Sequence, residues 1–247
     1  MIIIVPMAGR GARFADRGYE TPKPLIPVCG RPMVHWALKS LESLSCRRVI
    51  FIALAEHESK YQISKQLRGS TPSPAEFVFL DRVTEGQLCT VLTAASYLET
   101  DEDILIASAD TIVVSDLSRD IAARSSDCRG IISVAEMPGD RWSFARTDGA
   151  GRVVEVAEKV RISDLASTGL YYFSSGREFA ELGREIVAAQ ERTRGEYYVI
   201  PVYQKIIARG GRIAVSKARE MWDMGTPEAK AAFEAYLEKH GQRPSWS

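Results

Sequence analysis

The chain has 247 residues, and its 32 Lys and Arg side chains balance 32 Asp and Glu side chains, so the formal net charge is zero. Hydrophobic residues make up 45 % and charged residues 26 % of the chain, the balance of an ordinary globular protein. The neutral total argues against a general nucleic-acid binder, which carries a basic excess, and against an acidic disordered chain. The length suits one α/β domain whose core needs no disulfide or metal.

The N-terminus and the cysteines indicate a cytoplasmic protein. The first apolar run, residues 1–5, is short and follows no basic segment, so it does not resemble a signal peptide. No stretch approaches the ~18–20 apolar residues of a membrane span, so we expect no membrane partner. Wide spacings without a CxxC pair favour reduced core thiols over a zinc or redox site for Cys29, Cys46, Cys89 and Cys128.

Short β-branched runs alternate with helical patterns in the first half of the chain. They predict strands at 2–6, 49–54, 76–80 and 103–108, and helices between them at 32–44, 56–67 and 87–98. This alternation is typical of right-handed βαβ crossovers and of a mostly parallel sheet that is covered on both faces.

The pattern changes after about residue 128. Strands are predicted at 130–137, 143–147, 153–157 and 170–173, with little helix between them, which indicates an antiparallel or mixed extension of the same sheet. Helices are predicted at 176–190 and 197–209, and a strand at 212–216 precedes a last helix at about 227–240. Because no linker or repeat interrupts the chain, we expect a single domain, residues 1–247.

The segment after the first predicted strand is the most informative part of the sequence. It leaves the carboxyl end of the strand, where open α/β sheets bind ligands. Its glycines, Gly9 and Gly11, allow free amides to face an anion. The segment has a local charge of +3, because two acids, Asp16 and Glu20, face five bases: Arg10, Arg13, Arg17, Lys23 and Arg31.

This composition predicts a phosphate site, since phosphate is bound well by Arg forks and a compact Lys charge. The alternative is a flexible glycine turn with solvated arginines. Neither GxGxxG nor GK[ST] is present, so the segment is not a Rossmann fingerprint or a Walker A loop.

The joint order of several motifs resembles the nucleotidyltransferases known as nucleoside-diphosphate-sugar pyrophosphorylases. Residues 9–13 match the family's GxGxR sequence, and residues 22–24 match its PKP triplet. Further segments similar to family motifs follow in the same order at 84–87, 108–110, 158–159, 168–173, 195–198 and 222–227.

The resemblance covers most of the chain and implies a Rossmann-like (GT-A-like) three-layer α/β/α domain with a central, mostly parallel mixed sheet. It implies a nucleotide-binding part at about 1–128, an acceptor-binding part at about 129–227 and a C-terminal helix at about 227–240.

The implied activity is an Mg²⁺-dependent condensation of an NTP with a sugar 1-phosphate to give an NDP-sugar and pyrophosphate. A phosphate monoester is largely dianionic at pH 7, so the reaction needs positioning and charge neutralisation rather than a general base. In this resemblance Arg13 and Lys23 are catalytic, and Asp110 and Asp223 hold Mg²⁺. The nucleotide is bound by Ala8, Gly9, Arg10, Gly11, Glu85, Gly86, Gln87 and Ala109. The acceptor is bound by Glu158, Lys159, Thr168 and Gly169.

Each motif also has a simpler structural interpretation. Thr84 before an acidic residue suits a capped helix start, Asp110 and Asp223 suit turns, and Glu158 with Lys159 suits an exposed ion pair. The family usually has Pro after the Lys, but here Val160 and Arg161 follow, which makes Arg161 a candidate for an extra phosphate contact.

No histidine is assigned a catalytic role. His35 lies within an apolar helical pattern, and His57 and His240 are expected to be exposed.

Other functions remain open. A glycosyltransferase of the same α/β class is disfavoured, because residues 110–112 lack the second Asp of a DxD motif. A cytidylyltransferase acting on phosphocholine or another non-sugar phosphate is an alternative acceptor assignment, and its aromatic cage would draw on Trp142, Tyr172 and Trp222. A non-catalytic, nucleotide-sugar-binding regulatory protein is an alternative of another class. The expected partners are an NTP and a phosphorylated small molecule, with no nucleic acid, and a homo-oligomer is left open.

Overall fold

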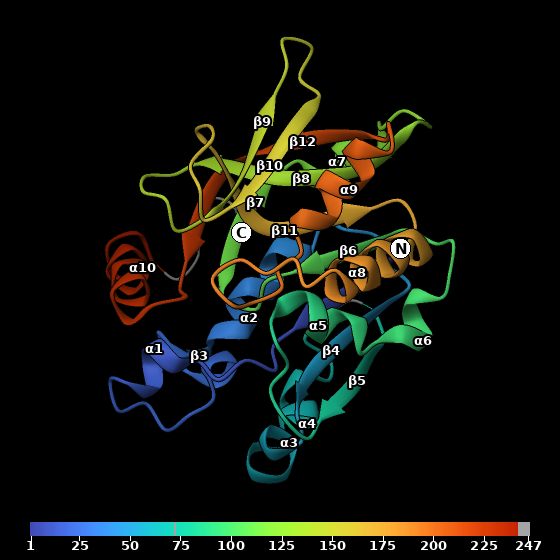
Figure 1. The fold of residues 1–247 in the computed structure, drawn as a ribbon. Coiled ribbons are helices and arrows are strands. Elements are labelled where there is room, and N and C mark those ends of the chain that lie inside the picture. The colour runs from blue at the N-terminus through green and yellow to red at the C-terminus, as the bar shows by residue number, and fades with distance from the viewer. Residues whose placement is uncertain (72, 242–247) are drawn as a thin grey trace.

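The computed structural model describes residues 1–71 and 73–241, and within these residues one ten-stranded sheet forms the centre of the molecule (Figure 1). Its strands are β1 (Ile2–Pro6), β4 (Arg48–Leu54), β5 (Ala75–Leu80), β6 (Ile104–Ala107), β7 (Thr111–Ser115), β8 (Cys128–Glu136), β9 (Ser143–Thr147), β10 (Val153–Glu158), β11 (Leu165–Phe173) and β12 (Arg212–Asp223). A separate small hairpin consists of β2 (Pro27–Val28) and β3 (Arg31–Pro32).

Ten α-helices and two 3₁₀ helices are formed by the described residues. The α-helices are α1 (Ala12–Ala15), α2 (Met33–Leu38), α3 (Ala55–Tyr61), α4 (Ile63–Leu67), α5 (Gln87–Leu92), α6 (Ala95–Leu98), α7 (Leu117–Ala122), α8 (Gly176–Ala188), α9 (Pro201–Ala208) and α10 (Pro227–His240). The 3₁₀ helices are η1 (Lys23–Leu25) and η2 (Lys39–Leu41).

The sheet is mixed and mostly parallel, as the sequence predicts. Its order is β5-β4-β1-β6-β11-β8-β12-β7, with β9 joining β11 and β10 joining β9. The pairings show that β5, β4, β1, β6, β8 and β12 run in one direction and that β11 and β7 run in the other. The parallel first half and the antiparallel insertions of the second half therefore form one continuous structure.

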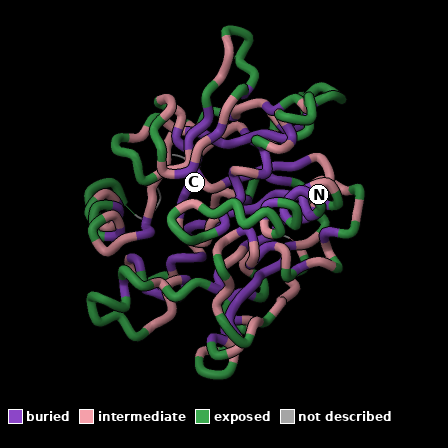
Figure 2. The backbone as a smooth tube through the Cα atoms, in the orientation of Figure 1, coloured by how far each residue is buried: buried purple, intermediate pink, exposed green. Residues whose placement is uncertain are grey.

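The two faces of the sheet carry separate cores, so the molecule has three layers. In β1, Ile2 and Ile4 pack with residues of α5, α8 and α9, whereas Ile3 and Val5 pack with residues of α2, α4 and α7. This alternation follows from the two-residue period of a strand, and apolar residues at every position satisfy both faces. Buried residues accordingly lie along the central strands, and exposed residues lie mainly in the outer loops (Figure 2).

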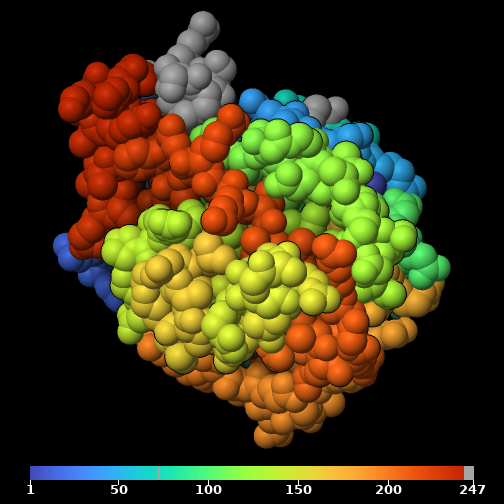
Figure 3. Space-filling model, turned by 90° about the horizontal axis from the view of Figure 1, so that it is seen from above, coloured from blue at the N-terminus to red at the C-terminus, as the bar shows by residue number. Residues whose placement is uncertain are grey.

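A third, smaller core attaches the C-terminal helix α10 beside the sheet. Phe233 of α10 packs edge-on against Trp36 of α2, with ring centroids 5.5 Å apart, and near Trp222 of β12. Seen from above, α10 stands at one side of the molecule while the β9–β10 hairpin covers the middle of this face (Figure 3).

Several predicted elements are corrected by the structure. The helix predicted at 56–67 is divided into α3 and α4 at Gln62, whose backbone has a φ of 51°. The helix predicted at 32–44 ends at Leu38 and continues only as η2, and the one predicted at 87–98 is divided between α5 and α6. The helix predicted from residue 197 begins at Pro201, where the proline suits a first helical turn.

Two further differences lie near Asp110. Strand β7 and helix α7 were not predicted, and β12 continues past residue 216 to Asp223. These differences matter because β7 and the second half of β12 pair with each other.

The cysteines and His57 show where burial differs from expectation. All four cysteines are free thiols, but only Cys128 is fully buried. His57, expected at the surface, is buried in α3, and burial lowers the pKa of its imidazole. In the described parts of the chain, no helix has both the length and the apolar character needed to cross a membrane.

We expect Tyr203→Phe to destabilise the fold measurably. The buried Tyr203 hydroxyl of α9 donates to the carbonyls of Ile131 in β8 (3.1 Å) and Tyr172 in β11 (2.9 Å). Its loss leaves these buried acceptors short of a donor and should lower the free energy of unfolding by about 1–3 kcal/mol in urea denaturation. Tyr236→Phe is the control, because the Tyr236 hydroxyl has no hydrogen-bond partner in the described residues. Equal stabilities of the two variants would contradict the prediction.

Candidate active site

Two aspartates from distant parts of the chain meet at one edge of the sheet. Asp110 follows β6, and Asp223 is the last residue of β12. The antiparallel pairing of β12 with β7 places Asp223 opposite Thr111, and the Met224 amide donates to the Asp110 carbonyl over 2.8 Å. The crevice expected at the end of β6 therefore receives a second carboxylate from the C-terminal part of the chain.

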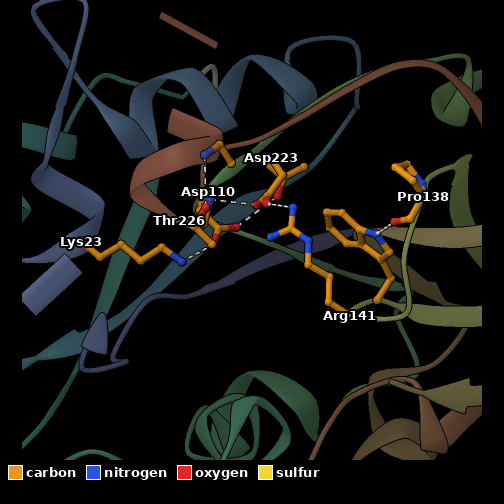
Figure 4. Close-up of polar contacts among 10 residues, drawn as sticks. Lys23, Asp110, Pro138, Arg141, Asp223 and Thr226 are labelled. Atoms are coloured by element: carbon orange, nitrogen blue, oxygen red, sulfur yellow. Dashed lines mark hydrogen bonds and ion pairs between the residues drawn. The ribbon is translucent and has the colours of Figure 1, made fainter. Parts of the chain in front are cut away.

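Each aspartate is paired with its own cation, and the two cations approach from opposite sides (Figure 4). Lys23 forms an ion pair with Asp110, and an Arg141 guanidinium nitrogen lies 2.7 Å from Asp223 Oδ2. The carboxylates converge on Gly225, where an added Cβ would lie 2.8 Å from Asp223 Oδ1 and 3.1 Å from Asp110 Oδ2. Only glycine leaves this space free, and its amide donates to Asp223 Oδ1 over 2.8 Å.

The two carboxyl groups differ electrostatically. Burial acts to raise the pKa of Asp110, but the Lys23 ammonium and the Thr111 hydroxyl outweigh burial and leave the pKa below its usual value. Burial and the nearby Asp110 charge raise the pKa of Asp223, despite the Gly225 amide and Arg141. A bound cation near both groups would relieve this repulsion.

The aspartates fit a magnesium site of the kind that uses few protein ligands. The described residues contain no cluster of three or more His, Cys, Asp or Glu side chains suited to a metal. Mg²⁺ is commonly bound by one or two carboxylates, with substrate phosphate oxygens completing its coordination. The carboxylate pair of Asp110 and Asp223 matches that donor set.

The glycine loop borders two adjoining pockets. One, of about 200 Å³, is lined by Gly9, Gly11, Lys23, Gln87, Ala109 and Asp110, among others. The next, of about 500 Å³, is lined by Ala8, Gly9, Arg10, Gly11, Gly86 and Gln87, together with Val83, Thr84, Thr90 and Glu196. Among the described residues, no protein acceptor pairs with the backbone amides of residues 8–11, so these donors are free for an anion.

The loop at 84–87 is held close to the segment that precedes α9. Gly86 has a φ of 135°, and a Cβ there would lie 2.4 Å from the Tyr197 carbonyl oxygen. The Tyr197 amide donates to the Glu85 carbonyl over 2.9 Å, and the Leu88 amide donates to the Tyr197 carbonyl over 3.1 Å. This contact fixes Gln87 at the junction of the pockets.

Glu85 is the predicted nucleotide-binding residue that does not line these pockets. Its carboxylate lies 2.7 Å from Arg192 at the surface. Of Glu85, only the backbone takes part in holding the loop at 84–87, because its carbonyl accepts the hydrogen bond from the Tyr197 amide.

The basic residues of the N-terminal loop divide into two groups. Arg10, Arg13 and Lys23 line the pockets at the sheet edge. Arg17 instead pairs with Glu228 of α10 at 2.7 Å, and the Arg31 guanidinium lies over the Trp36 ring at 5.6 Å. The local charge of +3 is therefore not directed at one site, contrary to the simplest interpretation of the sequence.

A third pocket, of about 320 Å³, adjoins the first and is also lined by Gln87 and Asp110. All four predicted acceptor residues line it: Glu158, Lys159, Thr168 and Gly169. Arg13, Asp110 and Asp223 line the same pocket. The carboxylate of Glu158 is buried and accepts a hydrogen bond from Ser143, and the Tyr171 hydroxyl donates to Ser143 Oγ over 3.3 Å. Burial raises the pKa of Glu158 and raises that of Tyr171 to about 12.

Thr168 provides an unsatisfied polar atom in this pocket. Its hydroxyl oxygen is buried and has no hydrogen-bond partner among the described residues. Buried hydroxyls are normally hydrogen-bonded, so this atom marks a position where a ligand group would be stabilised.

Other residues proposed for the acceptor lie elsewhere. Arg161 donates to the carbonyls of Met137 (2.8 Å) and Gly139 (2.7 Å) and pairs with Asp164, so it supports a loop instead of facing the pocket. Tyr172 is in the core and bonds to Asp103, and Trp222 packs against α10, so the trio suggested for an aromatic cage does not converge.

Sequence reasoning missed several lining residues. The third pocket is also lined by Arg141, Ser143 and Tyr198, to which no role was assigned from the sequence. Trp142, which was considered for an aromatic cage, lines the same pocket. Arg141 lies in the loop between β8 and β9, Ser143 is the first residue of β9, and neither carries a spacing signal. Tyr198, in contrast, belongs to a quoted motif and was detectable there.

A glycine-rich basic loop and a carboxylate pair at the edge of a mostly parallel sheet are features typical of nucleotide-binding α/β proteins. The family model described as the MobA-like NTP transferase domain matches residues 3–203, which is most of the chain. The chain therefore belongs to this family.

Individual relatives agree with this assignment. The nucleoside-diphosphate-sugar pyrophosphorylase from Vibrio cholerae RC9 superposes with a TM-score of 0.81 at 28 % identity, covering 94 % of this chain and 99 % of that one. UTP–glucose-1-phosphate uridylyltransferase AglF of Haloferax volcanii is 25 % identical over 97 % of both chains. Bifunctional protein GlmU of Kineococcus radiotolerans is 24 % identical over 90 % of this chain and 45 % of its own length. The chain thus spans about half the length of the GlmU relatives that it matches.

We expect Glu158→Gln to stabilise the fold at neutral pH. Burial disfavours the charged carboxylate and raises its pKa above the unfolded value, so the folded state favours the protonated form. The resulting penalty is present above the folded pKa and is lost as the pH falls below the unfolded pKa. Urea denaturation at pH 7.5 should therefore favour the Gln variant, and the difference should shrink at pH 4.

Glu155→Gln is the matched control on the same strand. The Glu155 carboxylate is exposed and lies 2.5 Å from Arg146. A stability gain that is equal in both variants, or independent of pH, would show that burial of Glu158 is not its cause.

Proposed function

We propose that the chain is an Mg²⁺-dependent nucleotidyltransferase that condenses an NTP with a sugar 1-phosphate, giving an NDP-sugar and pyrophosphate. The observation that carries this proposal is the position of the paired aspartates. Asp110 borders both a pocket at the glycine loop and the third pocket, which we call the acceptor-side pocket, and Asp223 lines the acceptor-side pocket. A reaction that joins two anionic substrates needs such a junction, where both can be held and their charge neutralised.

We assign binding of the nucleotide to the N-terminal glycine loop. The free amides of residues 8–11 and the side chains of Arg10, Arg13 and Lys23 would bind the triphosphate. Gln87 and the backbone at Glu85 and Gly86 would contact the base, since amide groups offer paired donors and acceptors.

An oxygen of the acceptor phosphate attacks the α-phosphorus, a new P–O bond forms, and the bond to pyrophosphate breaks. The attacking group is already an anion near pH 7, so no residue has to remove a proton. Arg13 and Lys23 would stabilise the charge that develops on the α-phosphoryl oxygens. Mg²⁺ held by Asp110 and Asp223 would add Lewis-acid neutralisation of the same oxygens.

We assign binding of the acceptor to the third pocket. Lys159 would bind the acceptor phosphate, while Glu158, Thr168 and Gly169 would contact the rest of the molecule. A buried carboxylate and an unpartnered hydroxyl suit the hydroxyl groups of a sugar. The names of the similar uridylyltransferase and pyrophosphorylase support the same choice.

The division into a nucleotide part at about 1–128 and an acceptor part at about 129–227 remains part of this proposal. Arg13 and Asp110 also border the acceptor pocket, so the two parts would share the reaction centre. An NTP substrate and four free thiols favour the cytoplasm as the location.

Pyrophosphate release tests the proposal directly. The four common NTPs are incubated with Mg²⁺ and a panel of sugar 1-phosphates, with phosphocholine as the non-sugar acceptor. We expect one or a few NTP and sugar 1-phosphate pairs to release pyrophosphate and to form the NDP-sugar. Turnover with phosphocholine alone would assign the acceptor to the non-sugar class, and nucleotide binding without any turnover would favour a regulatory protein.

Lys23→Ala should lower kcat more than it weakens NTP binding. If Lys23 acts mainly on transition-state charge, its removal should reduce kcat by roughly 10²–10³-fold with a smaller change in KM for the NTP. Arg17→Ala is the control, because Arg17 lies in the same loop but pairs with Glu228 away from the pockets. An unchanged kcat in the Lys23 variant, or an equal loss in both variants, would remove Lys23 from the catalytic role.

A further inference from the structure

Arg141 lies at the boundary between the aspartates and the acceptor-side pocket. Its guanidinium lies 2.7 Å from Asp223, and its side chain lines the pocket that also holds Lys159. The Asp223 side chain is only 11 % exposed, whereas that of Arg141 is 43 % exposed. The exposed arginine thus extends to a mostly buried carboxylate, on the side away from Lys23 (Figure 4).

The loop at 137–142 holds Arg141 in this position. Arg161 donates to the Met137 and Gly139 carbonyls, and the Trp142 indole donates to the Pro138 carbonyl over 3.0 Å. The Lys159 amide in turn donates to the Trp142 carbonyl over 2.9 Å. These hydrogen bonds anchor the loop in addition to the ion pair with Asp223.

The guanidinium also has a second support. Its central carbon lies 4.2 Å from the centroid of the Trp142 ring, a distance at which a cation is attracted to the aromatic face. A side chain stacked in this way can exchange one anionic partner for another while it stays at the pocket wall.

The charges at the site show why such an exchange is favoured. Asp110 and Asp223 are each neutralised by one protein cation, Lys23 on the glycine-loop side and Arg141 on the acceptor side. A divalent cation at the carboxylates would compete with both and would repel them. An incoming phosphate would be the alternative anion within the same pocket, and the planar Arg fork suits it well.

We propose that Arg141 pairs with Asp223 before the divalent cation binds, and that Arg141 then binds the phosphate group of the acceptor. The proposal rests on the function proposed above and adds a residue that the sequence motifs do not contain. It makes metal and acceptor binding cooperative, because the cation that leaves Asp223 becomes a phosphate ligand, and such coupling is reciprocal.

The first test measures the metal without any turnover. Mn²⁺ is titrated into the substrate-free protein and followed by electron paramagnetic resonance of free Mn²⁺. Arg141→Ala should bind Mn²⁺ roughly three- to tenfold more tightly than wild type, since a competing cation has been removed. Equal or weaker Mn²⁺ binding would overturn the proposal.

The second test measures the acceptor by calorimetry, with glucose 1-phosphate titrated into the Mn²⁺-loaded protein. Arg141→Ala should weaken this binding roughly tenfold or more, and Arg141→Lys, which keeps the charge but not the fork, should fall between the two. In wild type, glucose 1-phosphate should also tighten Mn²⁺ binding, and this effect should shrink in Arg141→Ala. Unchanged affinity for glucose 1-phosphate in Arg141→Ala would overturn the proposal.

Arg146→Ala is the matched control, because Arg146 in the following strand forms an exposed pair with Glu155. It should bind Mn²⁺ and glucose 1-phosphate like wild type. If Arg146→Ala reproduced the changes seen in Arg141→Ala, a general charge effect would explain them and the proposal would fail.

Binding and turnover separate the two proposals. If both binding predictions hold but no NTP pair releases pyrophosphate, the proposed function fails while the role of Arg141 stands. If pyrophosphate is released normally but the binding predictions fail, the role of Arg141 is wrong and the proposed function remains.

Discussion

The pairing of β12 with β7 is the interaction on which the candidate site depends. Asp110 and Asp223 lie in distant parts of the chain, and neither element alone forms a metal site. The antiparallel register places Asp223 opposite Thr111, and a backbone hydrogen bond from Met224 to Asp110 closes the junction. Gly225 completes this arrangement, because any larger residue would place a carbon atom between the two carboxylates.

Such a junction has an energetic cost that the surrounding side chains offset. Two carboxylates removed from water repel each other, and each is disfavoured by burial. Lys23 and Arg141 neutralise the carboxylates from opposite sides, which offsets their repulsion in the absence of a metal. Under the proposed function, a metal would have to displace these protein cations, which would remain beside the pockets proposed for the substrates.

The regular part of the fold was largely predictable from sequence. The strands β1, β4 and β6 form apolar, β-branched runs, because both of their faces are buried, while β5 at the sheet edge is only partly buried. The predicted bounds of all four strands differ little from the observed ones. The helix divisions were not predictable, since the break at Gln62 and the early end of α2 have no glycine or proline to signal them. Strand β7 was missed because it begins directly after Asp110, where the sequence suggested a turn.

The site was predictable in its motifs but not in its partners. Most residues quoted from the motifs line adjoining pockets, which follows from the rule that strand ends and their loops meet at one edge of a sheet. The partners of long charged side chains, however, depend on which loops lie next to one another in the folded chain, and the motifs do not specify this. Arg17 pairs with Glu228 of α10 and not with a pocket residue. Arg141, in a loop that carries no motif, pairs with Asp223.

This difference changes what the charge of the chain means. The sequence suggests that the basic N-terminal loop provides the positive charge for phosphates, but only part of that loop faces the pockets. The cation that pairs with Asp223 comes instead from the segment between β8 and β9. Because each carboxylate already has a protein cation, affinity for a divalent metal under the proposed function would depend on how readily Lys23 and Arg141 move to substrate phosphates. Under the same proposal, metal affinity would be a property of the substrate complex more than of the two aspartates alone.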